Sequence, residues 1–555
     1  MEDAEKIKND VENFPAKKLS LFLTNDIREK SGITKEEPVL DPLVSSLEYD
    51  SRGVKKDSLF FALPGLHTDG SVYINDAVKN GASVIAHENE IADNEKIDGV
   101  VYLKAKNCRF AMSPVCDSFY DFPSRRLLVT GVTGTEGKST TVYLIWQLLT
   151  FLGKKTGFIS TVQHCMGDAV LWNPEHQTTP EAPVTQKLLR RMADNGCEHA
   201  VLESSSHGLS VKTNRLGDVN YCCGVLTNIT HEHLEFNGTW EQYRDDKTNL
   251  FRALDNFRNV AGAALREPFG VINADDKSAS YVSKATKRKT LSFSASGKDG
   301  DIILKSIESG ADGNWYSVFI PALNERVEIR DKLPGAFNAA NVLAALLTVS
   351  GLLSVPVSEI AGFVKDLKPV KGRMSSVKAG QPFEVVIDYA HTPSSFSAIF
   401  PPLRERLDKK KGKIISVFGS PGERDTLKRS EQGKTAALYS DIIILTDEDP
   451  RGDDPMEILE EIALGVLAAD GKTVFKKAAF SDSDARRQPS RDENLFLIPD
   501  RPSAIRLAFT LAKDNDLVIL LGKSHENSII YKDYIIPFDE FKEAEKALAE
   551  MGYKK

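Results

Sequence analysis

The 555-residue sequence predicts an α/β protein, and at roughly 150 residues per domain it corresponds to three or four domains. Short apolar runs alternate with stretches of helical periodicity, which is typical of parallel sheets covered by helices. Two breaks rich in Pro, Arg and Lys interrupt this alternation, at 121–126 and at 368–373. We therefore expect domain boundaries near these breaks, which divide the chain into segments 1–122, 123–367 and 368–555.

Each segment has its own strand signals. In the first, Ser58–Leu63 and Ala82–Ala86 predict strands of a small α/β domain. The second begins with a strand over Leu127–Thr130, and its alternating pattern predicts a doubly wound parallel sheet. In the third segment, polar clusters follow the strand ends, where open parallel sheets bind ligands. Its expected strands are Glu384–Asp388, Ile414–Phe418, Asp441–Leu445 and Leu517–Leu521.

Composition excludes several classes of protein. Hydrophobic residues make up 41% of the chain, enough for several cores, so extensive disorder is excluded. The net charge of −8 argues against a typical nucleic-acid binder, and we expect no nucleic-acid partner. No apolar run reaches about 18 residues and the N-terminal segment is polar, so we expect a cytoplasmic protein without a membrane span. The six cysteines form no Cys-x-x-Cys pair, which favours buried thiols, as at Cys222 and Cys223.

A glycine-rich loop over Gly131–Thr140 is the strongest single motif. It follows the strand Leu127–Thr130 and opens an apolar helix over Thr141–Leu149, which is the context of a phosphate-binding P-loop. Lys138 would neutralise phosphate charge and Ser139 would hold Mg²⁺. The spacing departs from the strict P-loop pattern. A P-loop alone leaves a motor, a GTPase switch or a ligase open, so the downstream motifs must decide.

An ordered series of motifs follows the P-loop. It comprises Glu203–Gly208, Thr227–Glu235, Tyr243–Lys247, Val271–Asp276, Leu333–Asn341, Gly372–Arg373 and Asp388–Pro393. Together with the P-loop, this series resembles the Mur ligases, the ATP-dependent amide-forming enzymes of peptidoglycan precursor synthesis. The resemblance extends from about Tyr49 to Glu526. Further motifs resemble the tripeptide-synthetase branch of that family: Tyr49–Arg52, Gly65–Gly70, Phe418–Asp425, Asp447–Arg451 and Gly522–Glu526.

The resemblance implies three α/β domains and a reaction. A small N-terminal domain would bind the UDP end of the substrate, a central P-loop domain would bind ATP, and a C-terminal Rossmann-like domain would bind the incoming amino acid. ATP would phosphorylate the carboxylate of UDP-N-acetylmuramoyl-L-alanyl-D-glutamate, and the amine of a diamino acid would then attack the acyl phosphate. Phosphoryl transfer of this kind depends on positioning and on cations around the phosphate. We expect ATP and Mg²⁺ as cofactors and a monomeric protein.

The resemblance also assigns residues to the nucleotide and the metal. Lys138 and Arg373 would supply positive charge at the γ-phosphate, Asn341 would face adenine and Asp388 the ribose. Catalytic roles fall to Lys138, Lys247, His233 and Arg373, with Lys247 as a carbamylated lysine. Metal ligands would be Ser139, Glu203, His233 and Lys247. The ATP site would comprise Gly134, Thr135, Glu136, Gly137, Lys138, Ser139, Thr140, Asn341, Arg373 and Asp388.

Two further groups would hold the other substrates. The UDP-linked substrate would contact Tyr49, Ser51, Thr178, Thr179, Ser205 and Arg215. The amino acid would contact Arg424, Glu448, Asp449, Pro450, Arg451, Gly522 and Glu526.

The identity of the added amino acid depends on the segment Glu448–Arg451. Arg451 could pair with a distal carboxylate, which favours meso-diaminopimelate. Asp449 stands where diaminopimelate-adding enzymes typically have Asn, and its charge would favour a side chain that ends in an ammonium. The sequence therefore favours L-lysine or L-ornithine, with meso-diaminopimelate as the alternative. We expected the charge of Asp449 to act by partly neutralising Arg451.

Two other functions remain open at this point. Folylpolyglutamate synthetase shares the P-loop form and the acyl phosphate, but it begins close to its P-loop and would leave Tyr49–Arg52 without a role. A catalytically silent nucleotide-binding protein on the same scaffold would not need the charged groups of the reaction, all of which are present in this sequence.

Overall fold

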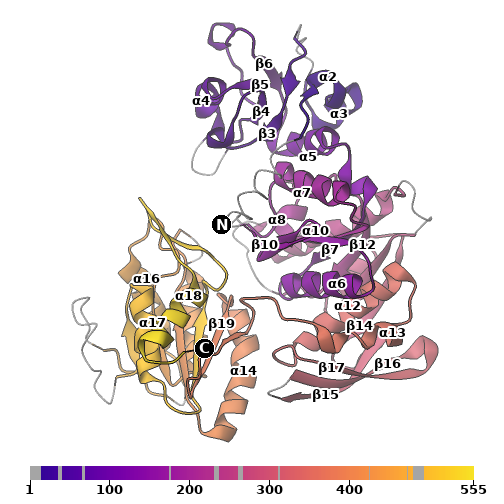
Figure 1. Cartoon of the computed structure of the whole chain (residues 1–555). Helices are drawn as coiled ribbons and strands as arrows, with labels where there is room; N and C mark the ends of the chain where they lie inside the picture. Colours follow the sequence, from indigo (N-terminus) through magenta and orange to yellow (C-terminus); the bar gives the residue numbers. More distant parts are fainter. Residues whose placement is uncertain are drawn as a thin grey trace. The chain divides into compact units, whose positions relative to one another are not determined.

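The computed structural model describes residues 14–34, 40–64, 69–173, 177–230, 237–260, 267–310, 313–423, 426–471, 473–478 and 493–554. The chain divides into two compact units: residues 1–332 with 336–367, and residues 333–335 with 368–555. Three sheets of four, eleven and six strands form the framework of these units, and helices pack on them (Figure 1). The α/β class predicted from the sequence is therefore confirmed.

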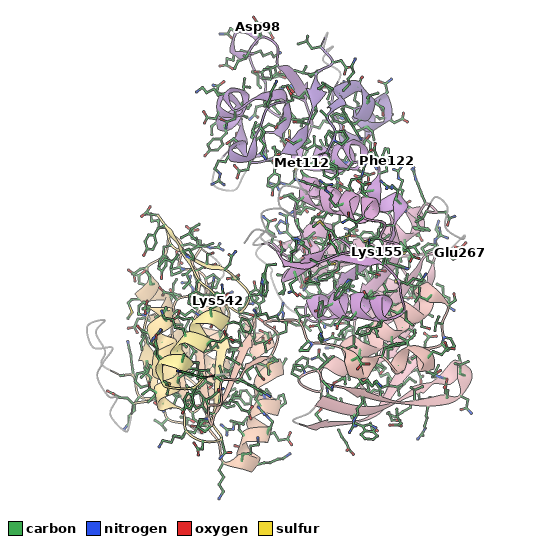
Figure 2. All side chains as sticks on the ribbon, viewed as in Figure 1. Asp98, Met112, Phe122, Lys155, Glu267 and Lys542 are labelled. Carbon is green, nitrogen blue, oxygen red and sulfur yellow. The ribbon has the colours of Figure 1, made fainter. Side chains whose placement is uncertain are left out.

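The four-stranded sheet lies in the N-terminal part of the first unit. Its strands are all parallel in the order β3-β4-β5-β6. Met112 of α5 is buried in its core and is labelled in Figure 2. The strands of this part are β1 (Lys17–Lys18), β2 (Leu43–Val44), β3 (Ser46–Glu48), β4 (Ser58–Phe61), β5 (Ala82–His87) and β6 (Val101–Lys104). Its helices are α2 (Leu19–Phe22), α3 (Asn25–Ser31), α4 (Ile74–Lys79) and α5 (Cys108–Phe119).

The eleven-stranded sheet has β7 near its middle, between β11 and β12. Both neighbours are parallel to β7, and all three strands are buried along their length. The parallel strands are β7 (Leu128–Thr133), β8 (Thr156–Ile159), β11 (His199–Glu203), β12 (Tyr221–Leu226), β13 (Phe269–Asn273) and β14 (Lys289–Ser294). The helices are α6 (Lys138–Phe151), α7 (Ala182–Asp194), α8 (Ser206–Leu209), α10 (Trp240–Ala253), α11 (Ala279–Ser283), α12 (Asn338–Leu353) and α13 (Val357–Ala361).

The sequence predicts a parallel sheet throughout, and this prediction is wrong at both edges. Antiparallel strands extend the sheet there. One edge carries β9 (Gln163–Cys165) and β10 (Val170–Trp172). The other carries β15 (Ile302–Gly310), which is parallel to β14 but antiparallel to β16 (Gly313–Ile320), and then β17 (Glu325–Asp331), which is antiparallel to β16. Only two residues separate β15 from β16, and so short a connection permits a hairpin but not a parallel crossover.

The six-stranded sheet belongs to the second unit and has the order β18-β19-β23-β20-β21-β22. Only β18 is antiparallel to its neighbour. The strands are β18 (Ser375–Val377), β19 (Glu384–Asp388), β20 (Ile414–Phe418), β21 (Ile442–Leu445), β22 (Leu495–Leu497) and β23 (Leu517–Leu521), with a hairpin of β24 (Ser528–Ile530) and β25 (Ile535–Pro537). The helices are α14 (Pro393–Lys410), α15 (Leu427–Ala437), α16 (Pro455–Leu467), α17 (Arg501–Leu511) and α18 (Glu540–Glu550).

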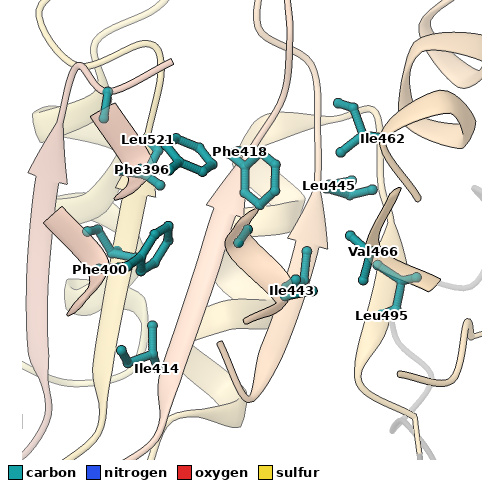
Figure 3. Close-up of a cluster of buried hydrophobic side chains, with 14 of the residues drawn as sticks. Phe396, Phe400, Ile414, Phe418, Ile443, Leu445, Ile462, Val466, Leu495 and Leu521 are labelled. Atoms are coloured by element: carbon teal, nitrogen blue, oxygen red, sulfur yellow. The ribbon is translucent and has the colours of Figure 1, made fainter. Parts of the chain in front are cut away.

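Apolar side chains cover both faces of this third sheet. On one face, Phe396 and Phe400 of α14 pack with Phe418 of β20 and Leu445 of β21 (Figure 3). A second cluster, which includes Phe509 of α17, covers the other face. The strands are therefore fixed in place, and the loops at their ends carry the polar residues.

The burial of the cysteines agrees with the sequence expectation. All six cysteines are buried and unbridged. None of the helices in the described parts of the chain combines the length and apolar character that a membrane crossing requires.

Candidate active site

The predicted phosphate loop connects β7 to α6. Gly134 and Gly137 have φ angles of 152° and 82°. A Cβ atom on Gly134 would lie 1.9 Å from Oγ1 of Thr227, and one on Gly137 would lie 2.4 Å from Oδ1 of Asn341. Both positions therefore require glycine. The loop leads directly into the N-terminus of α6, where backbone N–H groups and the helix dipole favour phosphate.

Two residues at the end of β12 hold the loop in shape. The hydroxyl of Thr227 donates to the carbonyl of Glu136 (2.6 Å), and the backbone N–H of Glu136 donates to Oδ1 of Asn228 (2.9 Å). The N–H of Thr135 donates to the carbonyl of Asn228 (2.8 Å). Both residues lie in the sequence motif Thr227–Glu235, but the motif alone predicts no role for Thr227 or Asn228. Their position at the carboxyl end of an apolar strand was the signal available.

Ser139 and Glu203 form a pair of oxygen donors beside the loop. Glu203 ends β11, and its Oε1 accepts a hydrogen bond from the Ser139 hydroxyl at 3.0 Å. Its Oε2 accepts from the N–H of Thr161 at 2.8 Å, and both side chains are buried. A hydroxyl and a carboxylate are ligands of the kind that Mg²⁺ prefers, so these residues fit the metal.

Lys247 on α10 reaches the same loop. Its side chain is only 2% exposed, which rules out a surface lysine. Its ammonium donates to the carbonyl of Gly134 (2.6 Å) and lies 4.3 Å from the ring centroid of Tyr243. The Tyr243 hydroxyl donates in turn to Oγ1 of Thr135 (3.2 Å). Thus α10 contacts the P-loop through two side chains. His233, the remaining predicted metal ligand, lies outside the described residues.

The other predicted nucleotide residues of the first unit lie on α6 and α12. Lys138 begins α6, and its ammonium donates to the carbonyl of Thr135 at 2.6 Å. Thr140 follows in the first turn and is half-buried. On α12, Asn341 is buried, and its Oδ1 accepts from the hydroxyl of Thr141 at 3.2 Å. Asn341 is therefore fixed beside Gly137 and the start of α6.

A second polar group lies at the end of β11. The Thr179 hydroxyl donates to the carbonyl of Glu203 (3.0 Å) and accepts from the Ser205 hydroxyl (2.9 Å). Arg215 donates to the carbonyl of Thr179 and to Glu181, both at 2.8 Å. Arg109 of α5 shares Oε1 of Glu181 at 2.7 Å. The structure thus brings together three residues predicted to contact the UDP-linked substrate: Thr179, Ser205 and Arg215.

Burial lowers the pKa of the Arg215 guanidinium, and Glu181 opposes that shift. Neither Glu181 nor Arg109 lies in a motif, so their roles could not be predicted from the sequence. The other predicted substrate residues occupy separate positions in the first unit. Thr178 is half-buried next to Thr179, and Tyr49 packs against the core of the four-stranded sheet. Ser51 begins a short turn after β3, and its carbonyl accepts from Asn80 (3.0 Å).

In the second unit, Arg373 and Asp388 lie close together. Asp388 ends β19, and its carboxylate accepts from the N–H groups of Met374 (2.6 Å) and Ala390 (2.7 Å). Burial raises its pKa, and the positive charge of Arg373 opposes that shift. The guanidinium of Arg373 lies 4.9 Å from the ring centroid of Tyr389.

The predicted amino-acid residues lie in the loops that follow β21 and β23. Glu448, Asp449 and Pro450 are buried, and Arg451 is half-buried. Gly522 directly follows β23 with a φ of 94°, and a Cβ atom there would lie 2.8 Å from Oε2 of Glu448. Glycine at 522 therefore lets the two loops approach each other. Arg424 lies outside the described residues.

The partner of Asp449 differs from the one we had expected. Its Oδ1 accepts from the ammonium of Lys523 at 2.8 Å and from the N–H of Ile530 at 2.9 Å. In the described part of the chain, its ion pair is with Lys523 and not with Arg451. Lys523 also pairs with Glu526. A buried lysine thus joins two of the predicted amino-acid residues.

The carboxyl of Glu448 has a strongly shifted pKa. Burial raises its pKa to about 7, and the nearby carboxylates of Glu526 and Asp449 act in the same direction, whereas Lys428 and Lys523 oppose it. Perturbed carboxyls of this kind are concentrated at functional sites, although structural networks produce them too.

A fully buried ion pair holds the backbone at the start of the two loops that follow β21 and β23. Arg501 and Glu540 are 0% exposed, and Nε and Nη2 of Arg501 each donate to the Glu540 carboxylate at 2.8 Å. Arg501 also donates to the carbonyls of Asp447 (3.2 Å) and Leu521 (2.7 Å), the residues that precede Glu448 and Gly522. We had assigned Arg501 no role, because it lies in no motif.

Ser524 has a φ of 45°, a value that favours glycine. Its hydroxyl donates to the carbonyl of Gly372 at 2.6 Å. This hydrogen bond helps to compensate for the unfavourable backbone conformation and ties the loop after β23 to the residue before Arg373.

Comparison with known proteins is consistent with this arrangement. Three family models match the chain: the Mur ligase family, catalytic domain (residues 43–115), the Mur ligase middle domain (132–349) and the Mur ligase, glutamate ligase domain (372–524). The chain is 48% identical over 524 residues to a UDP-N-acetylmuramyl-tripeptide synthetase of Treponema denticola, covering 91% of this chain and 94% of the relative. It is 44% identical to that of Treponema pallidum, covering 91% and 93%.

Among solved structures, a UDP-N-acetylmuramoyl-L-alanyl-D-glutamate–2,6-diaminopimelate ligase matches with a TM-score of 0.56 at 24% identity. The match covers 95% of this chain and 99% of that structure, and it supports the fold.

The chain belongs to the Mur ligase family. It is an ATP-dependent acid–amino-acid ligase of the tripeptide-synthetase type, and its cofactors are ATP and Mg²⁺. The catalytically silent alternative is thereby excluded, and the Treponema relatives favour this type over folylpolyglutamate synthetase.

Proposed function

We propose that this ligase adds a diamino acid, L-lysine or L-ornithine, to UDP-N-acetylmuramoyl-L-alanyl-D-glutamate in cytoplasmic peptidoglycan synthesis. The reaction would proceed through an acyl phosphate, with the domains divided at 122/123 and 367/368 and the protein acting as a monomer. The observation that carries the proposal is the Ser139–Glu203 oxygen pair beside a glycine-dependent P-loop, combined with the buried carboxylates after β21 and β23.

In the first step, an oxygen of the acceptor carboxylate attacks the γ-phosphorus of ATP, and ADP leaves. The P-loop residues Gly134 to Thr140 would hold the phosphates, and Lys138 and Arg373 would offset their charge. Ser139, Glu203, His233 and, as its carbamate, Lys247 would hold Mg²⁺, which would supply further positive charge at the phosphate. Asn341 and Asp388 would contact the adenine and the ribose.

The acceptor substrate would be held by residues that gather at the backbone carbonyl of Glu203. Thr179, Ser205 and Arg215 form one hydrogen-bonded group with the backbone carbonyl of Glu203, so a substrate bound there would lie next to the Ser139–Glu203 pair. Thr178 would contribute to the same group, and Tyr49 and Ser51 would contact the UDP end.

In the second step, the amine nitrogen attacks the acyl carbon, and phosphate leaves. Glu448, Asp449, Pro450, Arg451, Gly522, Glu526 and Arg424 would position the amino acid. The cluster of Lys523, Asp449 and Glu526 contains one ammonium and two carboxylates, which leaves a net charge of −1. A cluster with excess negative charge suits a neighbouring side chain that ends in an ammonium and disfavours a second carboxylate.

Phosphate release measured with the UDP-linked dipeptide and a panel of L-lysine, L-ornithine and meso-diaminopimelate tests this proposal. Turnover that requires both the acceptor and L-lysine or L-ornithine supports it. A preference for meso-diaminopimelate would contradict the amino-acid assignment, and turnover without the UDP-linked acceptor would contradict the whole proposal.

We expect Asp449→Asn to raise kcat/KM for meso-diaminopimelate relative to L-lysine or L-ornithine by at least about tenfold, because it removes one negative charge from the pocket. Competition between the amino acids in a single assay gives this ratio directly, and general damage to the enzyme cancels in it. An unchanged ratio would mean that Asp449 serves the loop structure only.

A further inference from the structure

Lys523 is a fully buried lysine between two carboxylates. Its side chain is 0% exposed, and its ammonium contacts Oδ1 of Asp449 at 2.8 Å and also Oε2 of Glu526. It follows Gly522 at the end of β23, so its backbone position is fixed by the sheet. The segment Gly522–Glu526 was recognised in the sequence, but Lys523 itself received no role.

The surroundings keep this lysine charged. Burial lowers the pKa of the ammonium, but the charges of Glu526 and Asp449 outweigh burial and raise it overall. Asp449 is held in addition by the N–H of Ile530, and Glu526 by the Tyr389 hydroxyl at 3.4 Å. Both carboxylates of the cluster are therefore held by groups outside it.

We propose that Lys523 is a specificity-determining positioning residue, whose ammonium holds Asp449 and Glu526 together and limits the charge of this three-residue cluster to −1. The inference deepens the proposed function and rests on its assignment of Asp449 and Glu526 to the amino acid. Lys523 acts through these two carboxylates and need not touch the substrate.

The charge of the cluster can be changed in steps. Lys523→Met leaves two carboxylates and a charge of −2, whereas Asp449→Asn leaves a charge of zero. The double variant has only Glu526 and returns to −1, the value of the wild type. If net charge governs selection, the double variant should resemble the wild type more than either single variant does.

The readout is the preference for L-lysine or L-ornithine over meso-diaminopimelate. It is measured as a ratio of kcat/KM values or, where a compound is not turned over, as a ratio of reciprocal inhibition constants for both compounds. We expect Lys523→Met to raise this ratio at least about tenfold, Asp449→Asn to lower it at least about tenfold, and the double variant to lie within about threefold of the wild type. Lys532→Met makes the same replacement at an exposed lysine of the β24–β25 hairpin and should leave the ratio unchanged.

Three results would overturn the inference: an unchanged ratio in Lys523→Met, shifts of the same sign in both single variants, or a double variant no closer to the wild type than the singles. If Lys523→Met does not fold, Lys523→Arg and the double variant carry the same test, because both keep the charge at −1. The preference of the wild type decides the proposed amino acid separately, since the direction of the shifts does not depend on which compound is preferred.

Discussion

Replacing Lys138 by alanine is expected to lower kcat by about 10²–10³-fold, the usual cost of removing one fixed group that stabilises transition-state charge. Lys138 begins α6 and contacts the P-loop through its ammonium. The substitution therefore removes a positive charge at the phosphates rather than packing contacts in the core. Acceptor- and amino-acid-dependent phosphate release measures the effect, and the melting temperature shows that the fold is intact.

Lys155→Ala is a matched control, because this exposed lysine lies just beyond the same helix (Figure 2). It should retain the activity of the wild type. A well-folded Lys138→Ala variant with nearly normal kcat would remove the basis for the P-loop assignment.

Replacing Lys247 by alanine is expected to lower kcat at least about 100-fold, and formate or acetate should restore part of the activity by supplying the missing oxygen ligand. The lysine is buried against Gly134 and Tyr243, so it acts next to the phosphate loop. Enzyme equilibrated with ¹³C-bicarbonate should show a carbamate signal that is absent from the variant.

Lys247→Arg distinguishes two roles that the position of Lys247 allows: a carbamate that binds the metal, and a cation near the phosphate loop. Arginine keeps a positive charge near the Gly134 carbonyl but cannot form the lysine carbamate. If Lys247 acts as a carbamate, the arginine variant should be as inactive as the alanine variant. Substantial activity of Lys247→Arg, without any effect of added carboxylic acids, would show that the residue acts as a cation.

The parallel strands were predictable because each combines a buried apolar run with a polar carboxyl end. Glu384–Asp388, Ile414–Phe418 and Leu517–Leu521 are strands with the predicted bounds. The hairpin strands β15 to β17 were missed, since alternating side chains such as those of β16 lack a continuous apolar run. Connection length, rather than strand composition, decides whether such strands are antiparallel.

Site residues within motifs could be named from the sequence, but their partners could not. Ser139 and Glu203 are 64 positions apart, and Lys523 and Asp449 are 74 apart, so only the fold brings them into contact. Asp449 and Arg451 are close along the chain, but the ion pair that Asp449 forms in the structure is with the distant Lys523. Arg501 shows the same limit, because its effect on two loops depends on the sheet beneath them.

The six buried cysteines have a practical consequence for labelling. Burial raises the pKa of the thiols of Cys108, Cys116, Cys165, Cys197 and Cys223, so little of the reactive thiolate forms near neutral pH. Maleimide dyes need an accessible thiolate, and none of the six side chains is exposed. A single cysteine introduced on the surface of either unit would therefore be the preferred target for a fluorophore or spin label, with all native cysteines left in place.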